Sequence, residues 1–155
     1  RSLSKPGQLP SLYLCLLVYS LQEGENEQLI RRLNLPAKLA RALRDTLHLK
    51  SRFHLLDKSS IKHSEIYYLL HEYDPLAIQA NVVAWESSTA CSKLELFLTE
   101  LRYVKTSLNG DKLKGLGIPP GPELGEILQI LRKAKLDGKV KTRAEEEKLA
   151  LSLKP

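Results

Sequence analysis

The side chains best suited to chemistry in this chain are the cations of one predicted helix, which follows Pro36. Its apolar residues recur on one side, and the opposite side carries, at offsets of three, seven and eleven, Arg41, Arg44, His48 and Arg52. Such a row can meet a nucleic-acid backbone, because each neutralised phosphate releases condensed counterions. The row therefore predicts phosphate contacts, and the alternative interpretation is a solvated helix face.

A second group of cations surrounds the Gly-Ile-Pro-Pro-Gly-Pro loop at residues 117–122 and comprises Lys112, Lys114, Lys139, Lys141 and Arg143. A helix that begins at Pro122, directly after Gly121, presents unpaired N–H groups to an anion. The alternative is a rigid corner that packs two helices together. In either case the cationic side chains are predicted RNA contacts.

No catalytic or metal-binding constellation is predicted in this chain. The four histidines, at positions 48, 54, 63 and 71, lack metal-ligand spacing, and Cys15 and Cys91 lie too far apart in sequence to suggest a zinc site or a disulfide scaffold. The acidic residues are scattered over predicted helix surfaces and helix starts, so they form no cluster of carboxylates that could bind Mg²⁺.

The aromatic residues of the central region follow helical spacing, which is typical of a core. They are Tyr67, Tyr68, Tyr73 and Trp85. One of them, if exposed, would offer a surface on which an RNA base can stack.

The elements that position these residues are predicted to be helices only, because leucine dominates and no sustained alternation of apolar and polar residues occurs. Pro119 and Pro120 exclude a helix at the loop, and Thr142 and Glu145 have capping-box spacing. The fold class is therefore all-α, an irregular multi-helix domain of about eight or nine helices. The expected ranges are 11–21, 26–33, 37–55, 63–72, 75–86, 89–107, 111–115, 122–135 and 143–152.

Length and composition favour one domain, or two small lobes, in a longer protein. The sequence has 155 residues, no methionine and a formal net charge of +6, which favours an anionic partner. Its longest apolar run is too short to span a bilayer, so we expect no membrane association. Two distant cysteines fit a reducing environment, so we expect a cytoplasmic location. We expect a helical body segment at residues 1–59 and a C-terminal helical tail domain at residues 60–155.

Several segments together resemble the C-terminal end of the bacterial tRNA nucleotidyltransferase/poly(A) polymerase family, the CCA-adding and A-adding enzymes. These segments are Asn109–Leu113, Leu116–Pro122, Gly125–Leu128, Leu136–Gly138 and Thr142–Glu147, with Ser64–Tyr67 and Leu98–Arg102 upstream. The resemblance covers about residues 60 to 150. Residues 1–59 resemble the family only in their predicted helical character.

The resemblance implies a non-catalytic C-terminal fragment that binds and positions tRNA, so that the 3′ end reaches an N-terminal catalytic domain of the same chain. Mg²⁺ and ATP or CTP are expected in that domain, and the fragment is predicted to be inactive alone. The parent enzyme would add CCA, only the final A, or a poly(A) tail. The expected partners are tRNA or another RNA, the catalytic domain, and, as an open alternative, a second copy of the chain.

A different class of function also fits the composition. In that interpretation the chain is a helical protein-interaction or dimerisation module whose leucine-rich faces bind another subunit, and its positive charge is incidental. Salt separates the two, because RNA binding weakens steeply as salt rises and apolar association does not.

Overall fold

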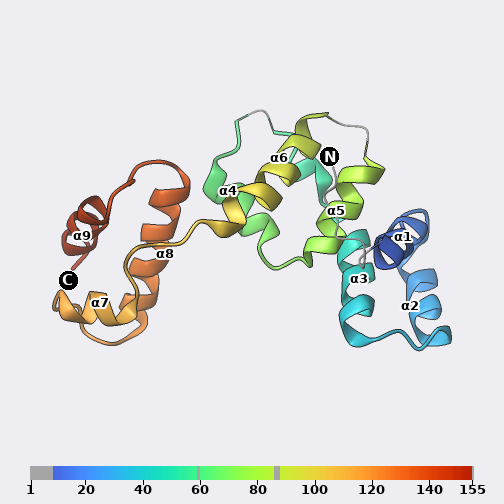
Figure 1. Cartoon of the computed structure of the whole chain (residues 1–155), viewed down its shortest axis with the longest axis horizontal. Helices are drawn as coiled ribbons and strands as arrows, with labels where there is room; N and C mark the ends of the chain where they lie inside the picture. Colours follow the sequence, from blue (N-terminus) through green and yellow to red (C-terminus); the bar gives the residue numbers. More distant parts are fainter. Residues whose placement is uncertain (1–8, 59, 86–87, 155) are drawn as a thin grey trace.

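The computed structural model describes residues 9–58, 60–85 and 88–154 (Figure 1). Within these residues the chain forms nine α-helices and no strand, which confirms the all-α prediction. The helices form two lobes joined by an extended connection at residues 104–109. We call α1 to α6 the N-terminal lobe and α7 to α9 the C-terminal lobe.

The helix bounds follow the predicted ranges closely. The N-terminal lobe contains α1 (Leu9–Val18), α2 (Glu23–Arg32), α3 (Ala37–Ser51), α4 (His63–Leu70), α5 (Pro75–Ala84) and α6 (Ser88–Thr99). Two short 3₁₀ turns follow α3 and α6, at Phe53–Leu55 and Leu101–Tyr103. The C-terminal lobe contains α7 (Gly110–Gly115), α8 (Pro122–Leu136) and α9 (Arg143–Ser152).

In the C-terminal lobe, the residues from which helix starts and ends are predicted adopt the expected conformations. Pro122 occupies the first turn of α8. Thr142 and Glu145 form the predicted capping box, in which the Thr142 hydroxyl accepts from the Glu145 N–H and the Glu145 carboxylate accepts from the Thr142 N–H. Gly138 follows α8 with a φ of 70°, a conformation that favours glycine at a helix C-terminus.

The predicted helix at 89–107 was too long. α6 ends at Thr99, whose hydroxyl donates to the Glu95 carbonyl at 2.8 Å, and Glu100 then leaves the helical region with φ −128° and ψ −63°. From Val104 the backbone is extended, with ψ 117°. The last part of the predicted helix is therefore the connection between the lobes. The helix predicted at 37–55 likewise divides at Arg52 into α3 and a 3₁₀ turn.

The N-terminal lobe has two hydrophobic clusters. One joins α1, α2 and α3 with Ala80 of α5, and the other joins the end of α3 with α4, α5 and α6. The second cluster takes Leu56 and Ile66 from the two sides of the predicted division between residues 59 and 60. That division into a body segment and a tail domain stays a prediction.

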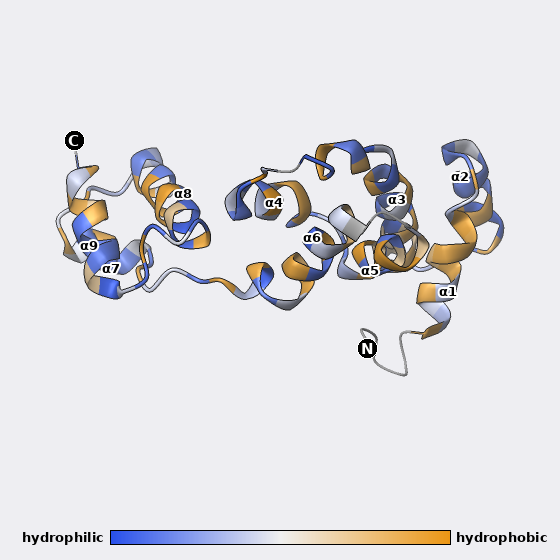
Figure 2. Ribbon diagram, turned by 90° about the horizontal axis from the view of Figure 1, so that it is seen from above, coloured by the Kyte–Doolittle hydropathy of each residue, from blue (hydrophilic) through white to orange (hydrophobic). Residues whose placement is uncertain are grey.

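The C-terminal lobe has its own small core, and α8 also reaches the other lobe. Ile127 and Leu131 of α8 pack with Leu113 of α7 and Ala150 of α9, whereas Leu136, at the end of α8, belongs to the core of the N-terminal lobe. In Figure 2 the apolar residues lie mainly where the helices of each lobe meet. α8 is therefore the element that both cores share.

Polar contacts fix the end of α8 against the start of α4. The Asp137 carboxylate accepts from the Ser64 N–H at 2.9 Å and from the Ser64 hydroxyl at 3.0 Å. Ser64 is in the first turn of α4, where N–H groups have no partner inside the helix. Asp137 thus caps a helix of the opposite lobe.

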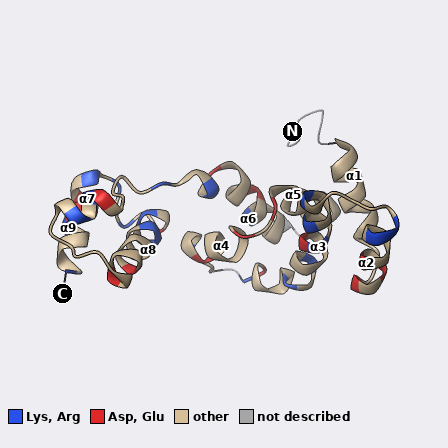
Figure 3. Ribbon diagram, turned by 90° about the horizontal axis from the view of Figure 1, so that it is seen from below, with Lys and Arg blue, Asp and Glu red and all other residues tan. Residues whose placement is uncertain are grey.

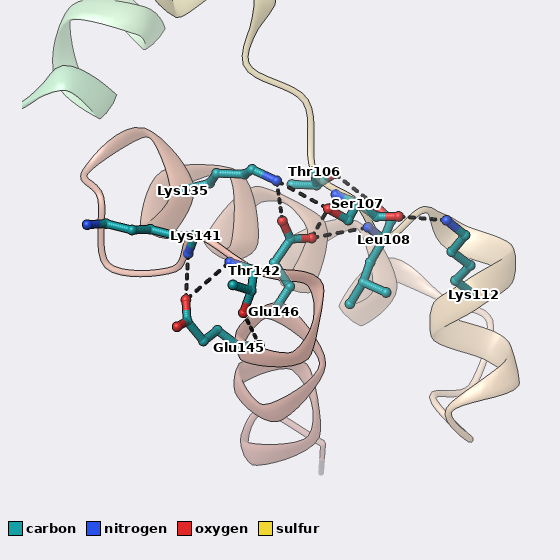
Figure 4. A network of polar contacts seen from close by, with 9 residues as sticks. All are labelled: Thr106, Ser107, Leu108, Lys112, Lys135, Lys141, Thr142, Glu145 and Glu146. Carbon is teal, nitrogen blue, oxygen red and sulfur yellow. Dashed lines mark hydrogen bonds and ion pairs between the residues drawn. The ribbon is translucent and has the colours of Figure 1, made fainter.

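A buried carboxylate, that of Glu146, holds the connection against the C-terminal lobe (Figure 4). It accepts from the backbone N–H groups of Ser107 and Leu108 at 2.8 and 3.1 Å and pairs with the Lys135 ammonium at 2.5 Å. Burial by itself would raise the pKa of Glu146, but the hydrogen bonds from Lys135, Leu108 and Ser107 favour the charged form and lower it. The side chain therefore stays ionised in the folded protein.

We predict that Glu146→Ala lowers the free energy of unfolding of the C-terminal lobe by about 2 to 3 kcal/mol, because it leaves a buried N–H, a partly buried N–H and an ammonium without their acceptor. Urea unfolding with hydrogen exchange resolved by helix measures this. Glu147→Ala is the matched control, since the Glu147–Arg143 pair is largely exposed and costs only about 0.5 kcal/mol to lose. Equal losses in the two variants would contradict the assigned role.

The same carboxylate predicts a pH dependence. Because folding lowers the pKa of Glu146 below its usual 4.5, its contribution to stability is complete above that pH and is lost as the pH falls through the lowered value. The stability of the C-terminal lobe should therefore fall in acid less steeply in Glu146→Ala than in the unaltered protein. Parallel pH profiles would contradict this.

We also predict that Asp137→Ala destabilises the contact between the lobes by about 1 to 2 kcal/mol, because the start of α4 loses an acceptor for two hydrogen bonds. Hydrogen exchange of the Ser64 N–H and of the neighbouring α4 amides should become faster. Asp111→Ala, which removes an exposed carboxylate on α7, should leave that exchange unchanged.

Candidate nucleic-acid interface

The structure divides the predicted cationic row of α3 into two environments. Arg41, His48 and Arg52 line a hollow of about 240 Å³ on the side where α3 faces α4, and Tyr73 lies in the same hollow. Arg44 points toward α2. The four residues therefore share a helix but not a single binding surface.

Hydrogen bonds and one long ion pair order the cations of the hollow, and the side chains of Arg41 and Arg52 stay exposed. Arg41 donates to the Glu72 carbonyl at 2.7 Å, its Nε is 3.7 Å from the Asp45 carboxylate, and its side chain is 65% exposed. The Tyr73 hydroxyl lies 3.0 Å from His48 Nδ1 and accepts a long, 3.5 Å hydrogen bond from Arg52. Two guanidinium groups thus remain available to solvent or to a phosphate.

Arg44 already has an anionic partner. Its guanidinium donates to both carboxylate oxygens of Glu27 in α2, at 2.6 and 2.9 Å. This hydrogen bonding lowers the pKa of Glu27, so the carboxylate stays charged. Arg44 is consequently the member of the row least available to an external phosphate.

The second predicted group belongs to the C-terminal lobe and is not brought onto the α3 surface. Lys112 donates to the Ser107 carbonyl at 2.8 Å, Lys114 lies 3.4 Å from Asp111, and Arg143 pairs with Glu147 at 2.7 Å. Lys139 and Lys141 are exposed in the turn between α8 and α9. The group is thus spread over α7, the turn after α8 and the start of α9, and Figure 3 shows basic residues on more than one helix of this lobe.

A groove between the lobes contains basic residues that sequence reasoning missed. Its volume is about 490 Å³, and α4, the connection and α8 contribute its walls. The polar side chains that line it are Tyr68, His71, Lys105, Thr106, Asn109, Gln129 and Arg132. Lys105 and Arg132 are 27 residues apart in sequence and line the same groove only through the tertiary fold, so no local pattern identifies them.

Tyr68 is the aromatic residue that belongs to this surface. Tyr67, Tyr73 and Trp85 pack against the core of the N-terminal lobe, as predicted for core residues, although Tyr73 also borders the α3 hollow. Tyr68 lines both the α3 hollow and the groove between the lobes. Burial raises the pKa of Tyr68, an effect that Arg132 opposes. Its hydroxyl is therefore protonated at neutral pH and can donate a hydrogen bond.

The part of the chain that the structure describes offers neither a metal site nor a membrane-spanning helix. Across residues 9–58, 60–85 and 88–154, no group of three His, Cys, Asp or Glu side chains could hold a metal ion. None of the helices described there is long and apolar enough to cross a membrane. Cys15 is buried and Cys91 partly so, and neither is in a disulfide.

Comparison with known proteins finds a similarity that agrees with the family resemblance. A stretch of 96 residues, 62% of this chain, is 33% identical to the A-adding tRNA nucleotidyltransferase of Geobacter sulfurreducens. The aligned stretch is 11% of that protein, so this chain corresponds to a small part of the relative. No protein-family model matches the chain, and no solved structure matches it.

Proposed function

We propose that this chain is an RNA-binding part of a protein related to tRNA nucleotidyltransferases, and that it positions tRNA in the cytoplasm without itself catalysing. The observation that carries the proposal is the similarity to an A-adding tRNA nucleotidyltransferase. In this role the chain is the C-terminal part of its protein. The 3′ end of the RNA reaches a catalytic domain elsewhere in that protein, where Mg²⁺ and the nucleotide bind.

The charge of the chain and the surface of α3 support this role. The net charge is +6, and Arg41 and Arg52 present guanidinium groups beside one hollow. Contacts of this kind read phosphates, 2′-hydroxyls and shape rather than sequence, as a protein that accepts many tRNAs requires. Lys112, Lys114, Lys139, Lys141 and Arg143 are further proposed contacts on the C-terminal lobe.

The test is tRNA binding by fluorescence anisotropy between about 50 and 300 mM salt. We expect salt-sensitive binding that Arg41→Gln/Arg52→Gln weakens about tenfold at low salt, with a salt slope reduced by about two, one for each lost phosphate contact. Arg44→Gln should change affinity by no more than about twofold, because Glu27 already occupies that guanidinium. Absence of binding at low salt, or equal effects of Arg44 and the Arg41/Arg52 pair, would contradict this assignment.

One observation favours the alternative, a protein-interaction or dimerisation module. α1 exposes three large apolar residues four positions apart, Leu9, Tyr13 and Leu17, and Tyr13 is 65% exposed. Residues with this spacing share one helix face, so the helix presents an apolar stripe. Such a stripe would suit either the catalytic domain of the same protein or a second copy of the chain.

The two roles differ in a measurement at high salt. Under the proposed function, sedimentation at about 0.5 M salt finds a monomer, and Tyr13→Glu/Leu17→Glu leaves tRNA affinity at low salt within about twofold. A salt-resistant dimer that this double variant dissociates would favour the dimerisation module instead.

A further inference from the structure

We infer that the groove between the lobes binds one unpaired nucleotide of an RNA strand, with its phosphate on Lys105 and Arg132 and its base against Tyr68. The inference rests on the proposed function and specifies a second RNA contact for it. It concerns residues outside the cationic row of α3 and outside the second predicted group.

Charge is the first argument. The ten residues that line the groove include Lys105, Arg132 and His71 and no aspartate or glutamate. By contrast, the neighbouring hollow of α3 includes the side chains of Asp45 and Glu72. Figure 3 shows basic residues on the connection and on α8, the two elements that bring Lys105 and Arg132 to the groove. The groove is thus an acid-free concave surface, which suits an anion.

The second argument is that the charges of the two cations are not neutralised by carboxylates. Neither Lys105 nor Arg132 takes part in an ion pair within the described residues. Arg132 donates to the Tyr67 hydroxyl at 3.3 Å and lies over the Tyr67 ring, 5.8 Å from its centre. This contact orients the guanidinium at the groove while leaving its charge uncompensated. A phosphate that binds there displaces no carboxylate.

The third argument is the aromatic ring of Tyr68, which lines the groove and on which a base can stack beside the bound phosphate. The Tyr68 ring meets Tyr67 and His71 edge to face, with centres 5.3 and 5.5 Å apart. The Lys133 ammonium lies 5.8 Å from the centre of the Tyr68 ring. These neighbours hold the ring in place. Proteins that bind single-stranded RNA combine such rings with a cationic track, since each base has a π face for stacking.

Size and hydrogen-bonding groups agree with a nucleotide. A volume of about 490 Å³ is within the range of small-ligand sites, and Asn109 and Gln129 contribute amides that can bond to ribose hydroxyls or base edges. The groove adjoins the α3 hollow at Tyr68, which lines both. The proposed nucleotide site is therefore next to the proposed phosphate contacts of α3.

The experiment compares two labelled probes by anisotropy at low salt: a uridine hexaribonucleotide and an abasic oligomer with the same number of phosphates. We expect Tyr68→Leu to weaken binding of the uridine probe about tenfold while changing the abasic probe by no more than twofold. Lys105→Gln and Lys105→Gln/Arg132→Gln should weaken both probes. Arg32→Gln/Lys148→Gln removes the same charge as the double variant from exposed sites on α2 and α9 and is the matched control.

The outcomes separate this inference from the proposed function. Groove variants that bind both probes as the control does, or an unaltered chain that binds neither probe, would overturn the groove as a nucleotide site. If tRNA binding remains sensitive to Arg41 and Arg52 in that case, the proposed function stands. Lys105→Gln keeps the test valid if Arg132→Gln loosens the packing on Tyr67, because Lys105 is exposed on the connection.

Discussion

The arrangement of the two lobes depends on one buried anion. Glu146 lies in the interior of the C-terminal lobe, and an ionised carboxylate is tolerated there only with strong hydrogen-bond donors around it. Its donors come from α8 and from the connection, so the same interaction that satisfies the charge also fixes the path of residues 107 and 108. Lys105 owes its place beside α8 to this path, and so does the groove.

What each cation is bound to matters more for function than how many cations the chain has. Lys135 and Arg44 are bound to carboxylates, and each therefore stabilises the fold rather than a ligand. Arg52 and Arg132 instead contact tyrosine hydroxyls, which orient a guanidinium without cancelling its charge. Unpaired guanidinium charge therefore lies beside Tyr67 and Tyr73, on α4 and in the turn after it, as well as on α3.

Local sequence signals were sufficient to predict most helix ends. They failed where contacts with distant parts of the chain determine the structure. Pro122, Thr142 and Gly138 act through their own backbone or neighbouring residues, so a sequence shows their effect directly. The end of α6 at Thr99 was missed because the apolar pattern continues through Leu101 and Val104, which pack on the core from a 3₁₀ turn and the residue after it. The pairing of Arg44 with Glu27 and the presence of Lys105 and Arg132 in one groove depend on how distant elements pack together. The separate roles of the α3 cations were therefore beyond sequence reasoning.

The sharing of α8 between two cores has a mechanical consequence. The C-terminal lobe is held to its neighbour by the connection, by Leu136 and Asp137 at the end of α8, and by the contact of Arg132 with Tyr67. The middle of α8 belongs to one core and its end to the other, so a shift of α8 along its axis would disturb the packing of both lobes at once. The groove, whose walls include α8 and the connection, takes its width from the same packing.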